Sequence, residues 1–123
     1  MKILKSGILL FLTLFGTMIV VNKIHFYYGW EDAFFRTVFA PFEDTVWAPS
    51  FSLQNFEKIQ FSMSKTEITR LLGEPLRKDC ANDDACIWIY SWQVEGTDDF
   101  DLRWVIFNKE GKVAELRKEF FID

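Results

Sequence analysis

The sequence predicts an α+β fold in which two short helices pack on an antiparallel three-stranded sheet, preceded by an N-terminal transmembrane helix. Three observations indicate this fold: an uncharged run at residues 6–21, a short helix with both ends marked near residues 64–73, and three later segments with strand-like alternation. We therefore expect a membrane anchor with an aromatic belt (1–30), an aromatic linker or interfacial segment (31–51) and an α+β domain (52–123).

The first segment has the composition of a membrane anchor. Residues 6–21 carry no charge, and Lys2, Lys5 and Lys23 flank them. This run is slightly shorter than the about 20 residues that span a bilayer, but the lysines can reach the interface and the aromatic side chains of residues 26–30 can form an interfacial belt. The lysine distribution, and the lack of a small-residue cleavage motif, predict an uncleaved single-pass anchor in the inner membrane, with the C-terminal domain in the periplasm.

Residues 31–51 are more aromatic than a tether requires. A short helix beginning at Glu31 would place Phe34, Phe35 and Phe39 on one side, and prolines break the pattern afterwards. Two readings remain open. The helix lies against lipid headgroups or the domain, or these three phenylalanines bind a membrane partner.

The helix at residues 65–72 carries signals at both ends. The Ser64 hydroxyl can cap it, the Glu67 side chain can reach back to the Ser64 amide, and Gly73 can adopt the left-handed conformation that ends the last turn. Its apolar stripe consists of Ile68, Leu71 and Leu72. A smaller helix is expected at residues 53–59.

Strands are expected at residues 87–94, 102–107 and 113–121, with a hairpin turn at 108–112 around Gly111. Both faces of this sheet would be apolar, although two short helices can cover only one. The uncovered face is therefore a candidate binding surface, and the residues expected to bind a partner there are Trp88, Tyr90, Trp92 and Trp104. The alternative is that these side chains form the core beneath the helices.

Cys80 and Cys86, with five residues between them, are expected to form a structural disulfide in an oxidising compartment. A zinc site is the alternative, but the spacing is too long and the only histidine, His25, lies beside the hydrophobic segment. The oxygen ligands of Asp79 and residues 82–84 lack the spacing of a calcium loop. We therefore expect no metal and no cofactor.

Charge and residue content exclude several functions. The first thirty residues carry +3 and the remainder −7 of the net −4, which argues against nucleic acid as a partner. A catalytic triad needs a base beside its nucleophile, and the only histidine lies near the membrane. The paired carboxylates fall in polar loops, where nothing would raise their pKa. The chain is therefore not expected to be an enzyme.

The capped helix and the strands after it carry a resemblance. The residues concerned are Ile59, Met63, Ile68, Leu71, Leu72, Gly73, Pro75, Trp88, Tyr90 and the hairpin at 105–113. Over residues 55–116 they resemble the SmpA/OmlA (BamE-type) family of small envelope proteins, which shares its architecture with β-lactamase-inhibitor-like domains. Ser62 stands where the family has glycine, and Ser64 where it has threonine. The acylated cysteine that ends the signal of family members has no counterpart after the hydrophobic run, because the first cysteine is Cys80.

The resemblance implies an interaction module of the cell envelope, related to outer-membrane assembly. We expect a membrane protein or an envelope assembly component as partner, and contact with the lipid bilayer through residues 6–21. One alternative is an accessory or inhibitor-like subunit that docks on an inner-membrane complex through its anchor and aromatic segment. A small metal-binding protein or hydrolase is a second alternative, which the scarcity of histidine disfavours.

Overall fold

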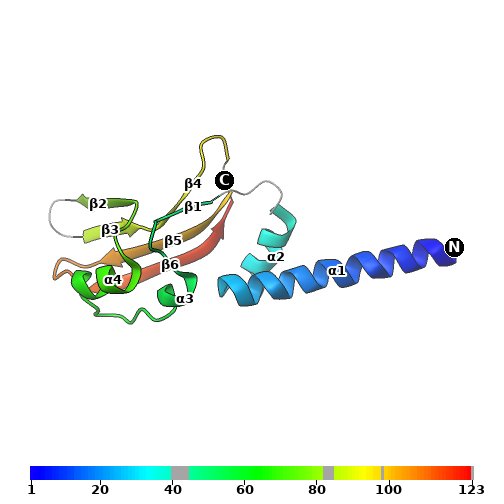
Figure 1. The fold of residues 1–123 in the computed structure, drawn as a ribbon, viewed down its shortest axis with the longest axis horizontal. Coiled ribbons are helices and arrows are strands. Elements are labelled where there is room, and N and C mark those ends of the chain that lie inside the picture. The colour runs from blue at the N-terminus through cyan, green and yellow to red at the C-terminus, as the bar shows by residue number, and fades with distance from the viewer. Residues whose placement is uncertain (40–44, 82–84, 98, 123) are drawn as a thin grey trace. The chain divides into compact units, whose positions relative to one another are not determined.

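The computed structural model describes residues 1–39, 45–81, 85–97 and 99–122 of the 123-residue chain (Figure 1). The chain forms two compact units, Met1–Pro41 and Phe42–Asp123. Asp83, Asp84 and Asp98, for which we expect solvated loops, lie outside the described residues, as does Phe42 of the aromatic segment.

The first unit consists of helix α1 (Lys2–Phe26) and helix α2 (Trp30–Phe39). At 1.5 Å per residue α1 is about 37 Å long, and its length and apolar composition suffice to cross a membrane. Helix α2 packs on α1 through polar contacts: Asn22 Nδ2 donates to Thr37 Oγ1 (2.9 Å), and Arg36 Nη1 donates to Asn22 Oδ1 (2.9 Å). The helix that we expected to begin at Glu31 begins one residue earlier, at Trp30.

The described residues of the second unit form two short helices, α3 (Leu53–Phe56) and α4 (Lys65–Leu72), and six strands. The strands are β1 (Thr45–Trp47), β2 (Arg77–Ala81), β3 (Ala85–Ile89), β4 (Ser91–Gln93), β5 (Phe100–Phe107) and β6 (Val113–Phe121). The antiparallel strands form a four-stranded sheet of order β2-β3-β5-β6 and a two-stranded sheet of β1 and β4. The α+β class with antiparallel sheets is confirmed.

The expected number of three strands is wrong, because the main sheet has a fourth, β2, at its edge. All five residues of β2 are exposed and four of them are polar or cysteine, so the segment lacks the apolar alternation by which a strand is recognised. Its place is set by pairing with β3, in which Cys80 lies opposite Cys86. The expected strand 87–94 is also interrupted, at Tyr90.

This interruption changes the direction of the side chains. Regular alternation would place Trp92 on the same face as Trp88. The register places Trp88 opposite Val105, yet the Trp92 ring stacks on Trp104, the neighbour of Val105 in β5 and therefore on the other face. The shift resembles that of a β-bulge. In keeping with it, the amide of Arg103 donates to Ser91 Oγ (2.7 Å).

Helices α3 and α4 cover one face of the main sheet (Figure 1). The buried cluster between them and the strands is Ala48, Phe56, Ile59, Ile68, Leu72, Cys86, Trp88, Tyr90, Val105, Phe107 and Val113. The Tyr90 hydroxyl donates to the Gly73 carbonyl (2.9 Å), which ties the end of α4 to the strands. Burial raises the pKa of Tyr90, so this phenol stays protonated and remains a donor.

The capping box expected at the start of α4 is confirmed. The Ser64 hydroxyl accepts from the Glu67 amide (3.2 Å), and the Glu67 carboxylate accepts from the Ser64 amide (2.7 Å). Gly73 has a positive φ of 76°, as required, although its ψ of −167° lies outside the left-handed helical region that we expected. The hairpin at residues 108–112 is also present, with Gly111 at φ 74°.

Part of the segment expected to be a linker belongs to the second unit. Val46 of β1 lies opposite Trp92 of β4, and Ala48 is buried in the core. Phe51 packs against this core, and the Trp47 ring stacks on it with centroids 5.0 Å apart. The aromatic residues from 45 onward therefore help to build the domain.

Candidate partner-binding surface

Two of the four sheet residues expected to bind a partner lie in the core. Trp88 is 4% exposed and Tyr90 is 0% exposed, both beneath the helices. Neither side chain is accessible to a partner. The expectation that these two residues bind a partner is therefore wrong, and they form part of the core, as the alternative had it. The cause is the face of the sheet on which they lie, since Trp88 shares its row with buried Val105.

Trp92 and Trp104 lie on the other face and form the middle of a row of four side chains. Their rings stack with centroids 5.9 Å apart and an interplanar angle of 13°. Arg77 Cζ lies 4.8 Å from the Trp92 centroid, and Arg117 Cζ lies 5.1 Å from the Trp104 centroid. We call Arg77, Trp92, Trp104 and Arg117 the arginine–tryptophan row. Both tryptophans are half-buried and keep part of their surface accessible.

The charges of this row are balanced within the protein. Arg77 pairs with Asp79 (2.9 Å), and Arg117 pairs with Glu119. These exposed pairs contribute little to stability, but they hold the guanidinium groups over the indole rings, where cation–π attraction adds to the packing. Trp104 Nε1 is buried and has no hydrogen-bond partner among the described residues. Tryptophan and arginine are the side chains that most often dominate binding energy at protein interfaces.

A hollow of about 280 Å³ adjoins one end of the row. Its lining residues are Val46, Leu76, Arg77, Ile89, Trp92 and Gln93. Val46 is 43% exposed and Leu76 is 38% exposed, so apolar side chains are open to solvent here. The hollow could hold one apolar side chain of a partner.

The sequence did not single out Val46, Leu76, Arg77 or Arg117. Strand pairing brings these side chains to the surface row. Val46 lies opposite Trp92, and one line across four strands runs through Arg77, Ile89, Trp104 and Arg117. The residues flanking an exposed tryptophan pair can be found only once this pairing is known. The one signal in the sequence was the alternation within β6, which predicts that the side chains of Leu116 and Arg117 lie on opposite faces of the sheet.

The expected binding residues Phe34, Phe35 and Phe39 belong to the first unit. Phe34 and Phe35 are exposed on α2, and Val38 extends their apolar patch. Phe39 is half-buried. The Phe34 ring also meets Phe15 of α1 edge-on, with centroids 6.0 Å apart. This patch is a second apolar surface, which we call the α2 patch: Phe34, Phe35 and Val38.

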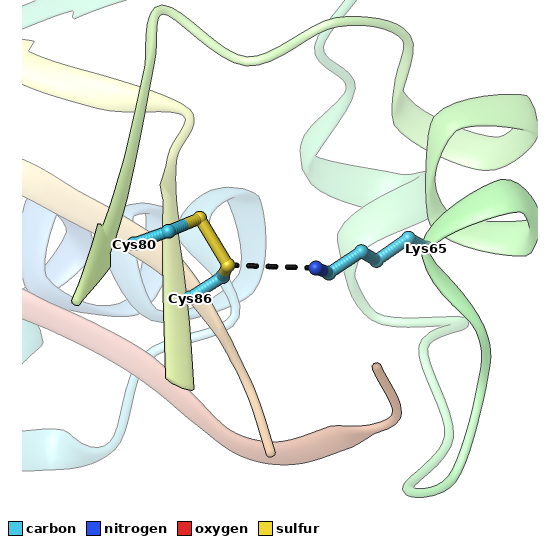
Figure 2. Close-up of a disulfide and its surroundings, with 3 residues drawn as sticks. All are labelled: Lys65, Cys80 and Cys86. Atoms are coloured by element: carbon cyan, nitrogen blue, oxygen red, sulfur yellow. Dashed lines mark hydrogen bonds between the residues drawn. A yellow bond between two sulfur atoms is a disulfide. The ribbon is translucent and has the colours of Figure 1, made fainter. Parts of the chain in front are cut away.

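Cys80 and Cys86 form a disulfide across β2 and β3, as Figure 2 shows. Lys65 of α4 points at it, with Nζ 3.4 Å from Cys86 Sγ. The bridge joins the exposed edge strand to the core, since Cys86 is buried and Cys80 is exposed. Within the described residues no group of three His, Cys, Asp or Glu side chains could hold a metal ion.

The sequence of this sheet-and-helix unit matches a known family. Residues 51–116, more than half of the 123-residue chain, match the outer membrane protein assembly factor BamE domain. The chain belongs to the BamE family. A comparison with curated proteins finds no match. The resemblance to the SmpA/OmlA (BamE-type) family is thus confirmed, and the matched region extends four residues further toward the N-terminus than the 55–116 expected from the motifs.

The BamE domain contains most of the candidate surface. Leu76, Arg77, Ile89, Trp92 and Trp104 lie within the matched residues, while Val46 and Arg117 lie just outside them. Helices α1 and α2 are also outside the match. The surface therefore combines a face of the BamE domain with residues that this chain adds on either side.

Proposed function

We propose that this chain is a membrane-anchored, non-enzymatic interaction module that faces the periplasm and takes part in outer-membrane assembly through its BamE domain. The observation that carries the proposal is the arginine–tryptophan row, an accessible aromatic surface on the face of a BamE domain opposite its helices. The family is described as an outer membrane protein assembly factor, and this supplies the process.

Several features support an anchor in the inner membrane. Helix α1 is long and apolar enough to span a bilayer, and Lys2 and Lys5 precede its apolar part, against Lys23 after it. More lysines before the span than after it favour a cytoplasmic N-terminus. The Cys80–Cys86 disulfide agrees with a domain in the oxidising periplasm.

The α2 patch favours a second candidate, an accessory or inhibitor-like subunit of an inner-membrane complex. Phe34, Phe35 and Val38 are exposed on a helix that Asn22 fastens to α1. An apolar patch held at the end of a membrane-spanning helix is placed to contact lipid or another membrane protein. Under this candidate the partner binds α1 and α2, and the BamE domain contributes little.

Affinity purification of the full chain from membranes in mild detergent separates the candidates. We expect a stoichiometric envelope-assembly partner whose recovery falls at least tenfold in a Trp92→Ala/Trp104→Ala double variant. Phe61→Ala, at an exposed aromatic residue outside the row, is the matched control and should leave recovery unchanged. A partner retained by the double variant but lost in Phe34→Ala/Phe35→Ala would favour the second candidate. Recovery of the protein alone, with bound metal or measurable turnover, would contradict both.

The periplasmic placement has its own test. Thiol labelling in cells, followed by a non-reducing gel, should find Cys80 and Cys86 unreactive until a reductant is added, because they form a disulfide. Free, rapidly labelled thiols in growing cells would place the domain in a reducing compartment and overturn the proposed topology.

A further inference from the structure

One edge of the sheet is built from two strands placed end to end. Strand β2 pairs along β3 as far as Arg77, which lies opposite Ile89, and β1 pairs along β4 from Trp47, which lies opposite Ser91. At the junction, the amides of Leu76 and Ala48 donate to consecutive carbonyls, those of Ile89 (2.8 Å) and Tyr90 (2.9 Å). The shift at Tyr90 lets both carbonyls face this side. We call β2 and β1 together the composite edge.

Strand β2 of the composite edge directs backbone groups away from the sheet. The Cα atoms of Cys80 and Cys86 are 4.1 Å apart, a separation typical of a non-hydrogen-bonded antiparallel pair, about 4.5 Å, and not of a hydrogen-bonded pair, about 5.5 Å. In such a pair the N–H and C=O groups point away from the partner strand. The backbone of Cys80, and by alternation that of Lys78, is therefore directed at the open side of β2. Among the described residues no strand pairs there.

The opposite edge of the sheet is different. At the start of β6, the segment before α4 pairs with the strand: the Ser62 amide donates to the Val113 carbonyl (3.0 Å), and the Val113 amide donates to the Met63 carbonyl (2.9 Å). Ser64 and Lys112 form a further bridge. Exposed edge strands invite pairing with another chain, and proteins usually cover or shorten them. Within the part of the chain that the structure describes, the start of β6 is covered and β2 is open.

The side chains along the composite edge indicate the composition of an added strand. The hollow between Val46, Leu76 and Arg77 lies at the junction of β2 and β1. Arg77 lines the hollow, while the next residue, Lys78, points to the helix face, where its Nζ lies 4.4 Å from the Trp88 ring centroid. In a strand added to this edge, one side chain would lie at the hollow, and the side chain of the next residue would lie on the opposite face, beside Lys78. An apolar residue followed by an acidic one fits both positions.

We propose that an extended segment of a partner protein adds to the composite edge as a further strand, with an apolar side chain in the junction hollow and an acidic residue opposite Lys78. The inference rests on the proposed function, since it specifies how the partner is held. Backbone pairing gives affinity, and the alternating side chains give specificity. The disulfide keeps β2 fixed to β3 in advance, which lowers the entropy lost on binding.

Position 78 offers a matched pair of variants. Lys78→Pro removes the lysine side chain and, in addition, the outward-facing N–H, at an edge where proline is tolerated because the native ladder does not use that group. Lys78→Ala removes the side chain, its contact with Trp88 and its ion pair with Glu74 (3.0 Å), but keeps the N–H. The two variants therefore separate backbone pairing from side-chain contacts.

The probe is a photoreactive p-benzoylphenylalanine that replaces Leu76 in the full chain in living cells. We expect one adduct to a partner protein, with a yield that falls modestly with Lys78→Ala, because the acidic residue of the partner loses the Lys78 ammonium, and at least tenfold with Lys78→Pro. Mass spectrometry of the adduct should identify a segment in which apolar and acidic residues alternate. Equal yields with Lys78→Pro and Lys78→Ala would overturn the proposal, as would an adduct to lipid or to a second copy of this chain.

Folding is checked by the thermal unfolding of each variant in detergent. If Lys78→Pro does not fold, hydrogen exchange of the Lys78 and Cys80 amides in the purified wild-type complex decides. At least tenfold slower exchange than in the free protein supports strand addition, and unchanged exchange overturns it. A partner that still co-purifies and depends on Trp92 and Trp104, without these edge effects, would leave the proposed function standing and remove only this inference. If no envelope partner co-purifies, both fail.

Discussion

Trp92 and Trp104 stack on the face of the sheet opposite the helices, although Trp92 lies four positions after buried Trp88. In an uninterrupted strand Trp92 would join Trp88 in the core. The shift at Tyr90 turns it outward and brings it beside Trp104. The accessible row thus exists because the strand is broken, and the same break allows two strands to share one edge.

The stacked pair should be energetically coupled. We expect the free energy of unfolding in a Trp92→Ala, Trp104→Ala double-mutant cycle to show an interaction of about 0.5–1.5 kcal/mol, the range for aromatic pairs. Urea unfolding of the full chain in detergent measures it. Phe61→Ala combined with Trp92→Ala is the control and should be additive. Additivity of Trp92→Ala with Trp104→Ala would mean that the two rings do not stack in solution.

Ser62 has a positive φ of 71°, a conformation that L-residues other than glycine rarely adopt. Its amide is already used in pairing with Val113, so the conformation is fixed by the fold. Ser62→Gly should therefore stabilise the protein by about 1 kcal/mol, because relief of the left-handed strain exceeds the entropy that glycine adds to the unfolded chain. Ser62→Ala keeps the Cβ and should bring no gain. A destabilised glycine variant would contradict the conformation of Ser62.

This position also shows what a sequence comparison can reveal. The resemblance implies a glycine where this chain has Ser62, and the positive φ supplies a physical reason for a glycine there. The local signals were equally informative for α4 and the hairpin, since the capping box of Ser64 and Glu67 and the turn at Gly111 depend on residues close in sequence. Elements specified by local chemistry could be predicted.

The rest of the fold depends on pairing between residues that are far apart in the sequence. Strand β2 is polar, so only its register with β3 identifies it, and the shift at Tyr90 follows from no local pattern in the sequence. For this reason Trp88 and Tyr90 could not be assigned to the core, nor Arg77 and Arg117 to the surface row. Trp92 and Trp104 lie half-buried on the face away from the helices, and their role in binding stays a prediction, whereas the side chains around them could be found only from the fold.

Gly73 should tolerate no side chain. A Cβ added there would lie 2.6 Å from the Ser50 Cβ, and its φ of 76° is unfavourable for L-residues. Gly73→Ala should lower the free energy of unfolding by about 2 kcal/mol or more, from backbone strain and steric overlap together. Ser50→Gly removes the overlapping atom, so the double variant should recover part of the loss and leave the strain. Calorimetry of the three variants measures both contributions, and a neutral Gly73→Ala would disprove the close approach.

The disulfide closes a short loop, with a sequence separation of 6 between Cys80 and Cys86. A Cys80→Ser/Cys86→Ser double variant should lose about 2 kcal/mol on the chain-entropy account of cross-links. A reductant should destabilise the wild-type protein by a similar amount and leave the double variant unaffected, which serves as the control. Urea unfolding with and without reductant gives both values. If reduction changed nothing, the bridge would not constrain the unfolded chain.

The capping box of α4 should make stability depend on pH. The Ser64 amide donates to the Glu67 carboxylate (2.7 Å), and this bond, with the Ser64 hydroxyl, lowers the pKa of Glu67 from its ordinary value of 4.5; Lys112 and Arg70 lower it further. A lowered pKa means that the folded state binds the proton less tightly than the unfolded chain. The stabilisation is therefore fully present above pH 4.5 and is lost as the pH falls through the folded pKa.

Glu67→Ala and Glu67→Gln separate the charge from the hydrogen bond. The difference in free energy of unfolding between the wild-type protein and Glu67→Ala should stay constant above pH 4.5 and shrink below it. Glutamine keeps an acceptor for the Ser64 amide but does not titrate, so the difference between Glu67→Gln and Glu67→Ala should not change over the same range. Urea unfolding at several pH values tests this. A wild-type advantage that persisted unchanged to low pH would show that the carboxylate charge does not contribute to the cap.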